Sequence, residues 1–141
     1  MTHAHSDHNG RLPLLYEKGF RGPIYCTDCT RDLTAIMLDM TARIAEGNDE
    51  MPRLYGQDAV NGVMGLIQPV PYDTRTERQG LAFRFTEAGH ILGSAMVEVW
   101  ADGRKVLFSG DMGNEFAPLL RRPARHREAD LVRRKGLRRP R

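Results

Sequence analysis

The chain has 141 residues, of which 40% are hydrophobic and 28% charged; this excludes a disordered chain and leaves room for one domain with a real core. It contains neither an apolar run of the roughly 18 to 20 residues that span a bilayer nor the start of a signal peptide, so we expect a cytoplasmic protein with no membrane partner. The net charge of +3 is uneven, because residues 120–141 carry ten Lys or Arg against two acids, or +8. We therefore predict a mildly acidic domain, 1–119, and a loosely ordered Arg-rich tail, 120–141.

Helices with short strands are predicted in the first half of the chain. A short amphipathic helix should begin near Leu12 and end at Gly19 or Gly22, and a brief strand follows at 23–26. A longer helix is predicted at 30–46, with Gly47-Asn48 as its end. Its apolar stripe, which we expect to face the core, consists of Leu33, Ile36, Met37, Met40 and Ile44. A weaker helix at 57–65 and a strand at 66–70 complete this half.

From Leu81 the hydrophobic period changes to two, which is typical of β-strands. Alternating patterns run over 81–86, 95–100 and 106–108, with a hairpin turn at Asp102-Gly103. Helices and short strands followed by a β-meander predict an α/β fold. In the tail, His126 stands in Arg-rich sequence, and we expect it to be a solvated surface residue.

Four metal-capable side chains lie within six residues near the start: His3, His5, Asp7 and His8. If His3 and His5 leave the end of a strand, they point the same way and can bind one ion, while Asp7 and His8 in the following turn can face a second. Imidazole and carboxylate without thiolate suit zinc, and also manganese or iron, in a catalytic site. The alternative for such a short cluster is a surface histidine run.

Two further candidate ligands lie at predicted strand ends. His90 stands in the break at 88–94, and Asp111 follows the strand at 106–108, each beside glycines that let the backbone turn and the side chain face a cleft. A single His or Asp is more often structural. His90 and Asp111 are therefore candidate metal ligands only in combination with the cluster near the start of the chain.

These segments resemble the metallo-β-lactamase superfamily, and more narrowly its β-CASP branch of RNA and DNA nucleases. The resemblance rests on the six candidate ligands His3, His5, Asp7, His8, His90 and Asp111. The β-CASP branch is indicated by the sequence motifs at Leu12-Pro13, 22–27, 30–33, 89–94 and 109–111. The similarity runs from about Thr2 to Leu120.

The resemblance implies how the ligands divide between two zinc ions. The first ion would be bound by His3, His5 and His90. The second would be bound by Asp7 and His8, and Asp111 would bridge the two. Thr2 and Ser109 are placed to orient these ligands, although each could instead cap the backbone.

The resemblance also implies a fold and a reaction. The fold would be a partial metallo-β-lactamase-type αββα sandwich that lacks the family's N-terminal strands and its β-CASP insertion. A hydroxide bridging the two metals would attack a phosphodiester, with Asp7 and Asp111 as the catalytic residues. The chain would then be a zinc-dependent hydrolase that cleaves RNA, or less readily DNA. A small-molecule metallohydrolase of the same superfamily is the alternative.

The family pattern breaks on both sides of the matched segment. The family's first strands would precede Thr2, and its acidic motif and two later histidines have no match after Asp111, so the second metal site is expected to be incomplete. Residues 129–132 resemble the start of the next strand, and the codons allowed for 133–141 can encode a close match to the acidic motif one base later. We therefore hypothesise a frameshift, which leaves an inactive truncated product as a further alternative and a homo-oligomer as a source of the missing parts.

The cysteine pair and the Arg-rich tail are more simply explained without a functional role. Cys26 and Cys29 form a lone Cys-x-x-Cys pair, which is too little for a disulfide framework and weak evidence for a metal or redox site. The Arg-rich tail could bind phosphates, but it has no aromatic residue for base stacking. We expect the pair to be structural or incidental and the tail to be solvated.

Overall fold

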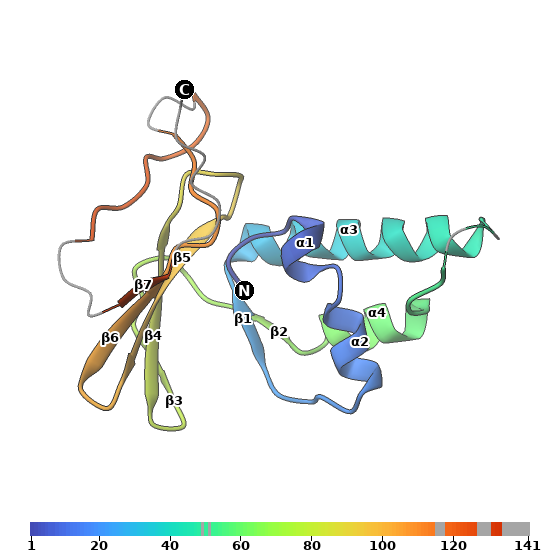
Figure 1. The fold of residues 1–141 in the computed structure, drawn as a ribbon, viewed down its shortest axis with the longest axis horizontal. Coiled ribbons are helices and arrows are strands. Elements are labelled where there is room, and N and C mark those ends of the chain that lie inside the picture. The colour runs from blue at the N-terminus through green and yellow to red at the C-terminus, as the bar shows by residue number, and fades with distance from the viewer. Residues whose placement is uncertain (49, 51, 115–117, 127–130, 134–141) are drawn as a thin grey trace. The chain divides into compact units, whose positions relative to one another are not determined.

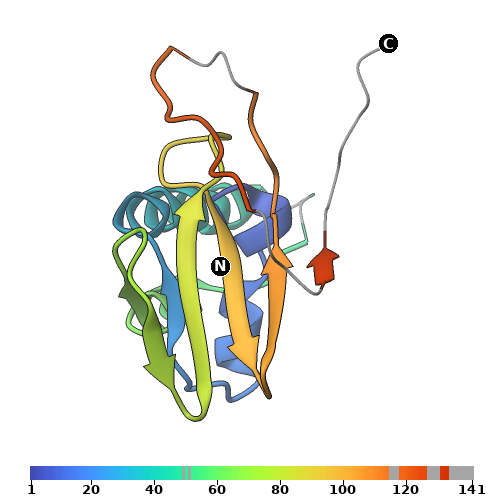
Figure 2. The ribbon, with the colours of Figure 1, turned by 90° about the vertical axis from the view of Figure 1, so that its left-hand side faces the viewer.

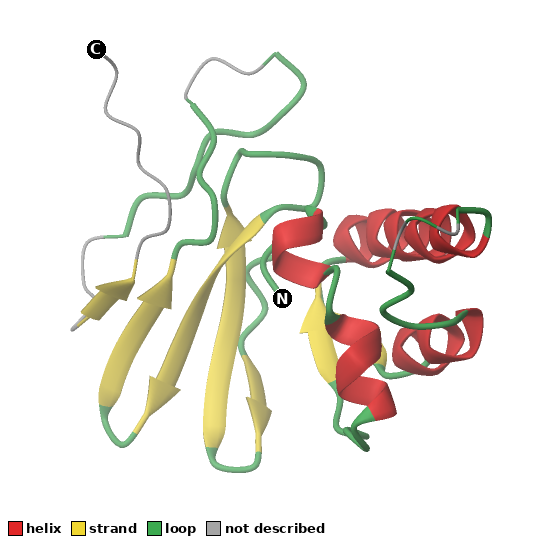
Figure 3. Ribbon diagram, turned by 45° about the vertical axis from the view of Figure 1, so that its right-hand side comes forward, coloured by secondary structure: helices red, strands yellow, loops and turns green. Residues whose placement is uncertain are grey.

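The structure, a computed structural model, describes residues 1–48, 50, 52–114, 118–126 and 131–133 (Figure 1). The chain divides into two compact units, and each is described here by itself. The N-terminal unit consists of Met1 and His3–Pro69, and the C-terminal unit of Thr2 and Val70–Arg141. Helices dominate the first unit and strands the second, which confirms the α/β class (Figure 3).

The N-terminal unit combines helices with a short parallel sheet. Its elements, in chain order, are α1 (Ser6–Asn9), α2 (Leu12–Glu17), β1 (Ile24–Cys26), α3 (Asp28–Glu46), α4 (Gln57–Met64) and β2 (Ile67–Pro69). Strands β1 and β2 pair in parallel, with Ile24 opposite Ile67. The predicted helices and strands of this half are confirmed, with ends that shift by one or two residues, and α2 ends nearer to Gly19 than to Gly22. Helix α1 is an additional helix where only a turn was predicted.

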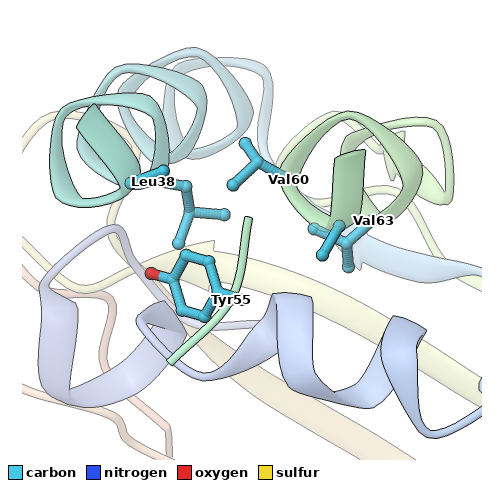
Figure 4. Packing of buried hydrophobic residues seen from close by; sticks show 6 residues of the cluster. Leu38, Tyr55, Val60 and Val63 are labelled. Atoms are coloured by element: carbon cyan, nitrogen blue, oxygen red, sulfur yellow. The ribbon is translucent and has the colours of Figure 1, made fainter. Parts of the chain in front are cut away.

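The core of this unit lies where α3 and α4 meet (Figure 4). Leu38 and Ala42 of α3 pack with Ala59, Val60 and Val63 of α4, and with Tyr55 just before α4. Helix α2 packs against α4 at Gly62, where an added Cβ would lie 2.2 Å from the Tyr16 ring. The two helices can approach this closely only because position 62 has no side chain.

Helix α3 begins two residues earlier than predicted because Thr27 caps it. The Thr27 hydroxyl accepts a hydrogen bond from the Thr30 backbone N–H, which satisfies one donor of the first turn. The helix ends at Gly47, as the sequence predicted.

The face of α3 that packs inward is not the predicted one. Its buried residues are Thr30, Thr34, Leu38 and Ala42. Three members of the predicted stripe, Ile36, Met40 and Ile44, are instead 56%, 53% and 53% exposed. The prediction was wrong because it considered hydrophobicity alone. Thr30 and Thr34 occupy the inward face because their hydroxyls form hydrogen bonds there.

The C-terminal unit contains a five-stranded sheet (Figure 2). Its strands, in sheet order, are β3 (Thr76–Arg78), β4 (Leu81–Glu87), β5 (Ala95–Ala101), β6 (Arg104–Phe108) and β7 (Leu131–Arg133). Neighbouring strands are antiparallel except β7, which pairs in parallel with β6. The predicted meander is confirmed, and β7 agrees with the strand start that the sequence indicated at 129–132, of which 129–130 lie outside the described residues.

Two tight turns connect the antiparallel strands at one end of this sheet. In each turn both central residues have positive φ, at Gln79 and Gly80 (49° and 80°) and at Asp102 and Gly103 (48° and 71°). Two consecutive left-handed residues define the type I′ hairpin turn, whose twist matches that of the strands it joins. The predicted hairpin at Asp102-Gly103 is confirmed.

The described part of the tail, 118–126, packs on this sheet. The backbone N–H of Ala124 donates to the Glu87 carbonyl at 2.9 Å, and Ala124 contacts the cluster of Ala88, Met96 and Leu107. The prediction that His126 is solvated is wrong. Its side chain is 10% exposed because Nδ1 lies 3.0 Å from Glu98 Oε1 and Nε2 lies 3.1 Å from Thr86 Oγ1.

The last part of the tail, including 134–141 and the hypothesised frameshift, lies outside the described residues. None of the helices in the part of the chain that the structure describes is long and apolar enough to cross a membrane.

Candidate metal centre

The N-terminal unit brings the first four candidate ligands together. His3 is fully buried, and its Nε2 lies 3.1 Å from His5 Nδ1. The His3 ring also lies 4.1 Å from the His8 ring, centroid to centroid, and His8 Nε2 lies 3.5 Å from Asp7 Oδ2. The backbone before His5 is not in a strand, and Asp7 and His8 lie in α1 and not in a turn, so the predicted local structure was wrong although the side chains converge.

Asn9 ties this cluster to α3. The Asn9 side-chain amide is 1% exposed and donates to the Ala4 carbonyl at 2.9 Å and to Thr34 Oγ1 at 3.1 Å. Ala4 lies between the first two histidines, so these bonds fix the backbone that carries them. Asn9 was not among the predicted site residues, and the signal that could have singled it out was an amide directly after the cluster.

The C-terminal unit brings the other two candidate ligands together. His90 Nε2 lies 3.9 Å from Asp111 Oδ2, a distance too long for a hydrogen bond. His90 follows β4 and Asp111 follows β6. The segment after β4 and the segment after β6 meet at Gly113. The Gly113 N–H donates to the Ala88 carbonyl at 2.9 Å. A Cβ added at Gly113 would lie 1.6 Å from the Gly89 carbonyl oxygen, so only glycine fits there.

Ser94 shapes the segment that carries His90. Its buried hydroxyl accepts hydrogen bonds from the backbone N–H groups of His90 at 3.0 Å and Ile91 at 3.2 Å. Gly89 and Gly93 on either side have positive φ, 64° and 78°, which glycine adopts without strain. The sequence motif contained Ser94, but only the structure shows that it organises the turn.

Two residues with a predicted orienting role contact the backbone beside Asp111. The Ser109 hydroxyl donates to the Gly110 carbonyl at 2.9 Å, and an added Cβ at Gly110 would lie 2.8 Å from the Thr2 Cβ. Gly110 has a φ of 57°, so a side chain there would be strained as well as crowded. These contacts shape the turn, and an effect on the ligands remains a prediction.

The ligand distances within each unit suit shared metal ions. Two ligand atoms that each lie about 2.0 to 2.2 Å from a tetrahedral ion are roughly 3.3 to 3.6 Å apart. The three pairs, at 3.1, 3.5 and 3.9 Å, scatter around this range. Imidazole nitrogen and carboxylate oxygen form a donor set that divalent metal ions accept, so the residues fit a divalent metal ion.

A groove lies beside α1. It has a volume of about 530 Å³ and is lined by Ser6, Asp7, His8, Arg11, Leu12 and Leu15. The Asp7 side chain is 62% exposed, so its carboxylate reaches the solvent in this groove. A substrate in the groove would therefore contact two candidate ligands directly.

The cysteine pair does not form a disulfide. Both thiols are free, Cys26 is buried and Cys29 is exposed. Burial raises the pKa of the Cys26 thiol to about 11, so it stays protonated at neutral pH and is a poor metal ligand.

The model of the metallo-beta-lactamase superfamily matches residues 1–135, so the chain belongs to this superfamily. Family membership implies a divalent metal site, and the mixed helices and sheets agree with part of the metallo-β-lactamase fold.

Named relatives narrow the placement within the superfamily. The chain is 36% identical to Ribonuclease TTHA0252 of Thermus thermophilus over 94% of its own length and 30% of the relative's. It is 38% identical to Transcription termination factor FttA of Methanosarcina mazei, over 85% of this chain and 19% of the relative. It is 32% identical to Endoribonuclease YSH1 of Yarrowia lipolytica, over 82% of this chain and 14% of the relative. The chain thus spans less than a third of each relative, and the similarity confirms the resemblance to the β-CASP branch.

Proposed function

We propose that the six candidate ligands hold two divalent metal ions, zinc by preference, in a hydrolase that cleaves RNA phosphodiesters. The observation that carries the proposal is the 3.1 Å approach of His3 Nε2 to His5 Nδ1 at a fully buried histidine. His3 is buried and His5 is exposed, and two imidazole nitrogens this close must share either a proton or a metal ion. Two relatives that cover most of the chain are named a ribonuclease and an endoribonuclease.

We assign the ligands as the sequence predicted. His3, His5 and His90 would hold one ion, and Asp7 and His8 the other. Asp111 would contact both, since a carboxylate offers two oxygens where an imidazole offers one nitrogen. The pairs that each unit brings together support this assignment, and Asn9 and Ser94 would keep the ligand backbones in place.

Metal ions in such a site lower the pKa of bound water to about 7 and stabilise negative charge on a phosphoryl group. The chain's own residues would position the reaction. Asp111 would hold both ions through its two carboxylate oxygens. The exposed carboxylate of Asp7 would orient water at the groove. Arg11, which also lines the groove, would bind a phosphate of the RNA backbone.

We also propose that the protein acts in the cytoplasm. RNA is abundant there, and the free thiols of Cys26 and Cys29 suit a reducing compartment.

Metal content and RNA cleavage test the proposal together. Elemental analysis of the purified chain should find up to two zinc ions per molecule, and His5→Ala and Asp111→Asn should each lower the content. A labelled single-stranded RNA should be cleaved, with loss of cleavage on chelation and in both variants. Asp58→Asn, at an exposed aspartate in the first turn of α4, is the matched control and should keep both properties.

Each failure has a distinct meaning. A chain that binds no zinc, manganese or iron contradicts the metal site. Bound metal with no RNA cleavage contradicts the substrate, and single-stranded DNA, thioester and lactone substrates then test the alternatives. Cleavage that survives in His5→Ala would come from a contaminant or another site.

A further inference from the structure

Trp100 on β5 is surrounded by cations. The Arg75 guanidinium carbon lies 4.8 Å from the centre of the indole ring, the Lys105 ammonium 5.4 Å and the Arg84 guanidinium carbon 5.6 Å. All three distances are within the range of cation–π attraction. The ring is only partly buried, so an aromatic surface and three positive groups lie together at the solvent.

This tryptophan lines a groove of about 520 Å³ between the two tight turns of the sheet. Arg75, Arg78 and Arg104 line it as well, and each is exposed. The volume is within the roughly 300 to 1,000 Å³ of small-ligand pockets. Type I′ turns form two of its walls.

The groove is separate from the candidate ligands of the same unit. Both turns lie at the lower end of the sheet in Figure 2, whereas His90 and Asp111 follow the upper ends of β4 and β6. The seven residues of β5 correspond to roughly 20 Å at about 3.3 Å per residue. The groove is therefore a second surface, one strand length away from those ligands.

The charge of the groove favours an anion. Glu98 near the ring is already neutralised, because Arg84 and Lys105 both pair with it. Glu77 and Asp102 are the acids of the lining, and Glu77 is paired with Arg75 at 3.6 Å. The three lining arginines outnumber these two acids. Arg78 ends β3 beside one turn and Arg104 begins β6 beside the other, where they could hold successive phosphates.

We propose that this groove binds single-stranded RNA, with one base stacked on Trp100 and the flanking phosphates on Arg75, Arg78 and Arg104. The choice of RNA rests on the proposed function. An aromatic platform between basic side chains is how proteins bind single strands without reading their sequence. A double helix keeps its bases stacked on one another and offers none to Trp100, so single strands should bind better.

Trp100 is the only tryptophan of the chain, so its fluorescence reports this groove directly. The experiment titrates the full chain with oligouridylate of about eight nucleotides, within the site sizes of single-strand binders, in the presence of a chelator. We expect saturable quenching. Arg75→Glu and Arg104→Glu keep the reporter and should each weaken binding about tenfold or more at low salt, while Arg31→Glu makes the same charge change in the other unit and should weaken it less than about twofold.

The outcomes separate this inference from the proposed function. Quenching without any metal-dependent cleavage would support the groove and contradict the nuclease. If the chain cleaves RNA but its Trp100 fluorescence does not change when RNA is added, only the inference that the groove binds RNA is overturned. Equal weakening in Arg31→Glu, or equal quenching by oligoglutamate, would also overturn it, because the binding would then be general charge attraction or peptide recognition.

Discussion

Removing the Glu98 carboxylate should destabilise the protein strongly. The side chain is 0% exposed, and its two oxygens accept hydrogen bonds from Arg84 at 2.6 Å, from Lys105 at 2.5 Å and from His126 at 3.0 Å. In Glu98→Ala these donors lose their common acceptor while the sheet and the tail still cover the position. Breaking a buried ion pair on one side costs about 3 to 5 kcal/mol. The Arg84 and Lys105 side chains are 36% and 21% exposed and can be solvated once the carboxylate is gone, so we expect a loss of unfolding free energy in the lower part of that range.

Urea unfolding followed by Trp100 fluorescence measures this loss, since the ring lies beside Arg84 and Lys105. The matched control is Glu77→Ala on β3, where the carboxylate is 76% exposed and pairs with Arg75 at 3.6 Å. An exposed pair contributes less than about 1 kcal/mol. If both variants lost the same small free energy, the Glu98 cluster would not hold the sheet. Should Glu98→Ala fail to fold, Glu98→Gln keeps the shape and should still lose about 1.5 to 3 kcal/mol.

Three further predictions concern acid, the ligand loop and helix packing. Burial raises the pKa of Glu98, but hydrogen bonds from its cationic partners outweigh burial and hold the pKa below the usual value, so urea midpoints should fall as acid protonates it, and fall less in Glu98→Gln. Asn9→Ala should cost about 1 to 3 kcal/mol and weaken zinc binding about 10- to 100-fold in calorimetric titrations. Gly62→Ala should cost about 1 to 3 kcal/mol in thermal unfolding because its methyl group meets the Tyr16 ring, whereas Gly65→Ala should change little.

Each of these predictions has a result that would contradict it. The sign of the acid effect follows from the lowered pKa: the stabilisation is full above the unfolded-state pKa of about 4.3 and is lost as the pH falls through the folded-state value. Equal acid sensitivity in wild type and Glu98→Gln would assign the effect to other carboxylates. Unchanged zinc affinity in Asn9→Ala would limit that residue to stability, and equal melting of both glycine variants would mean that α2 and α4 are not in close contact.

Local patterns predicted the elements of this fold and the identity of the candidate ligands. The helix at 30–46, the meander from Leu81 and the turn at Asp102-Gly103 depend on neighbouring residues, whose spacing is visible in the sequence. The strand β3 was missed because Thr76–Arg78 is short and polar, as suits an exposed edge strand. Convergence of His3 with His5, and of His90 with Asp111, was expected and is found within each unit.

Two of the errors arose where a polar side chain is buried by a distant partner. Thr34 faces inward because Asn9, 25 residues earlier, donates to it. His126 is buried because Glu98, 28 residues earlier, accepts from it. Hydrophobicity scales assign both types of residue to the surface, and only the folded chain supplies the hydrogen bonds that offset their desolvation.

The parallel pairing of β7 with β6 has a consequence for the order of folding. Strands β3 to β6 are joined by tight turns or by the short loop at 88–94, so their contacts are local and should form early. Strand β7 pairs only after the chain has returned from Phe108 to Leu131, and closing that loop costs entropy before any contact compensates for it. His126 lies in the same returning segment, so its bond to Glu98 should form after the main barrier. Weakening that bond should therefore accelerate unfolding more than it slows folding.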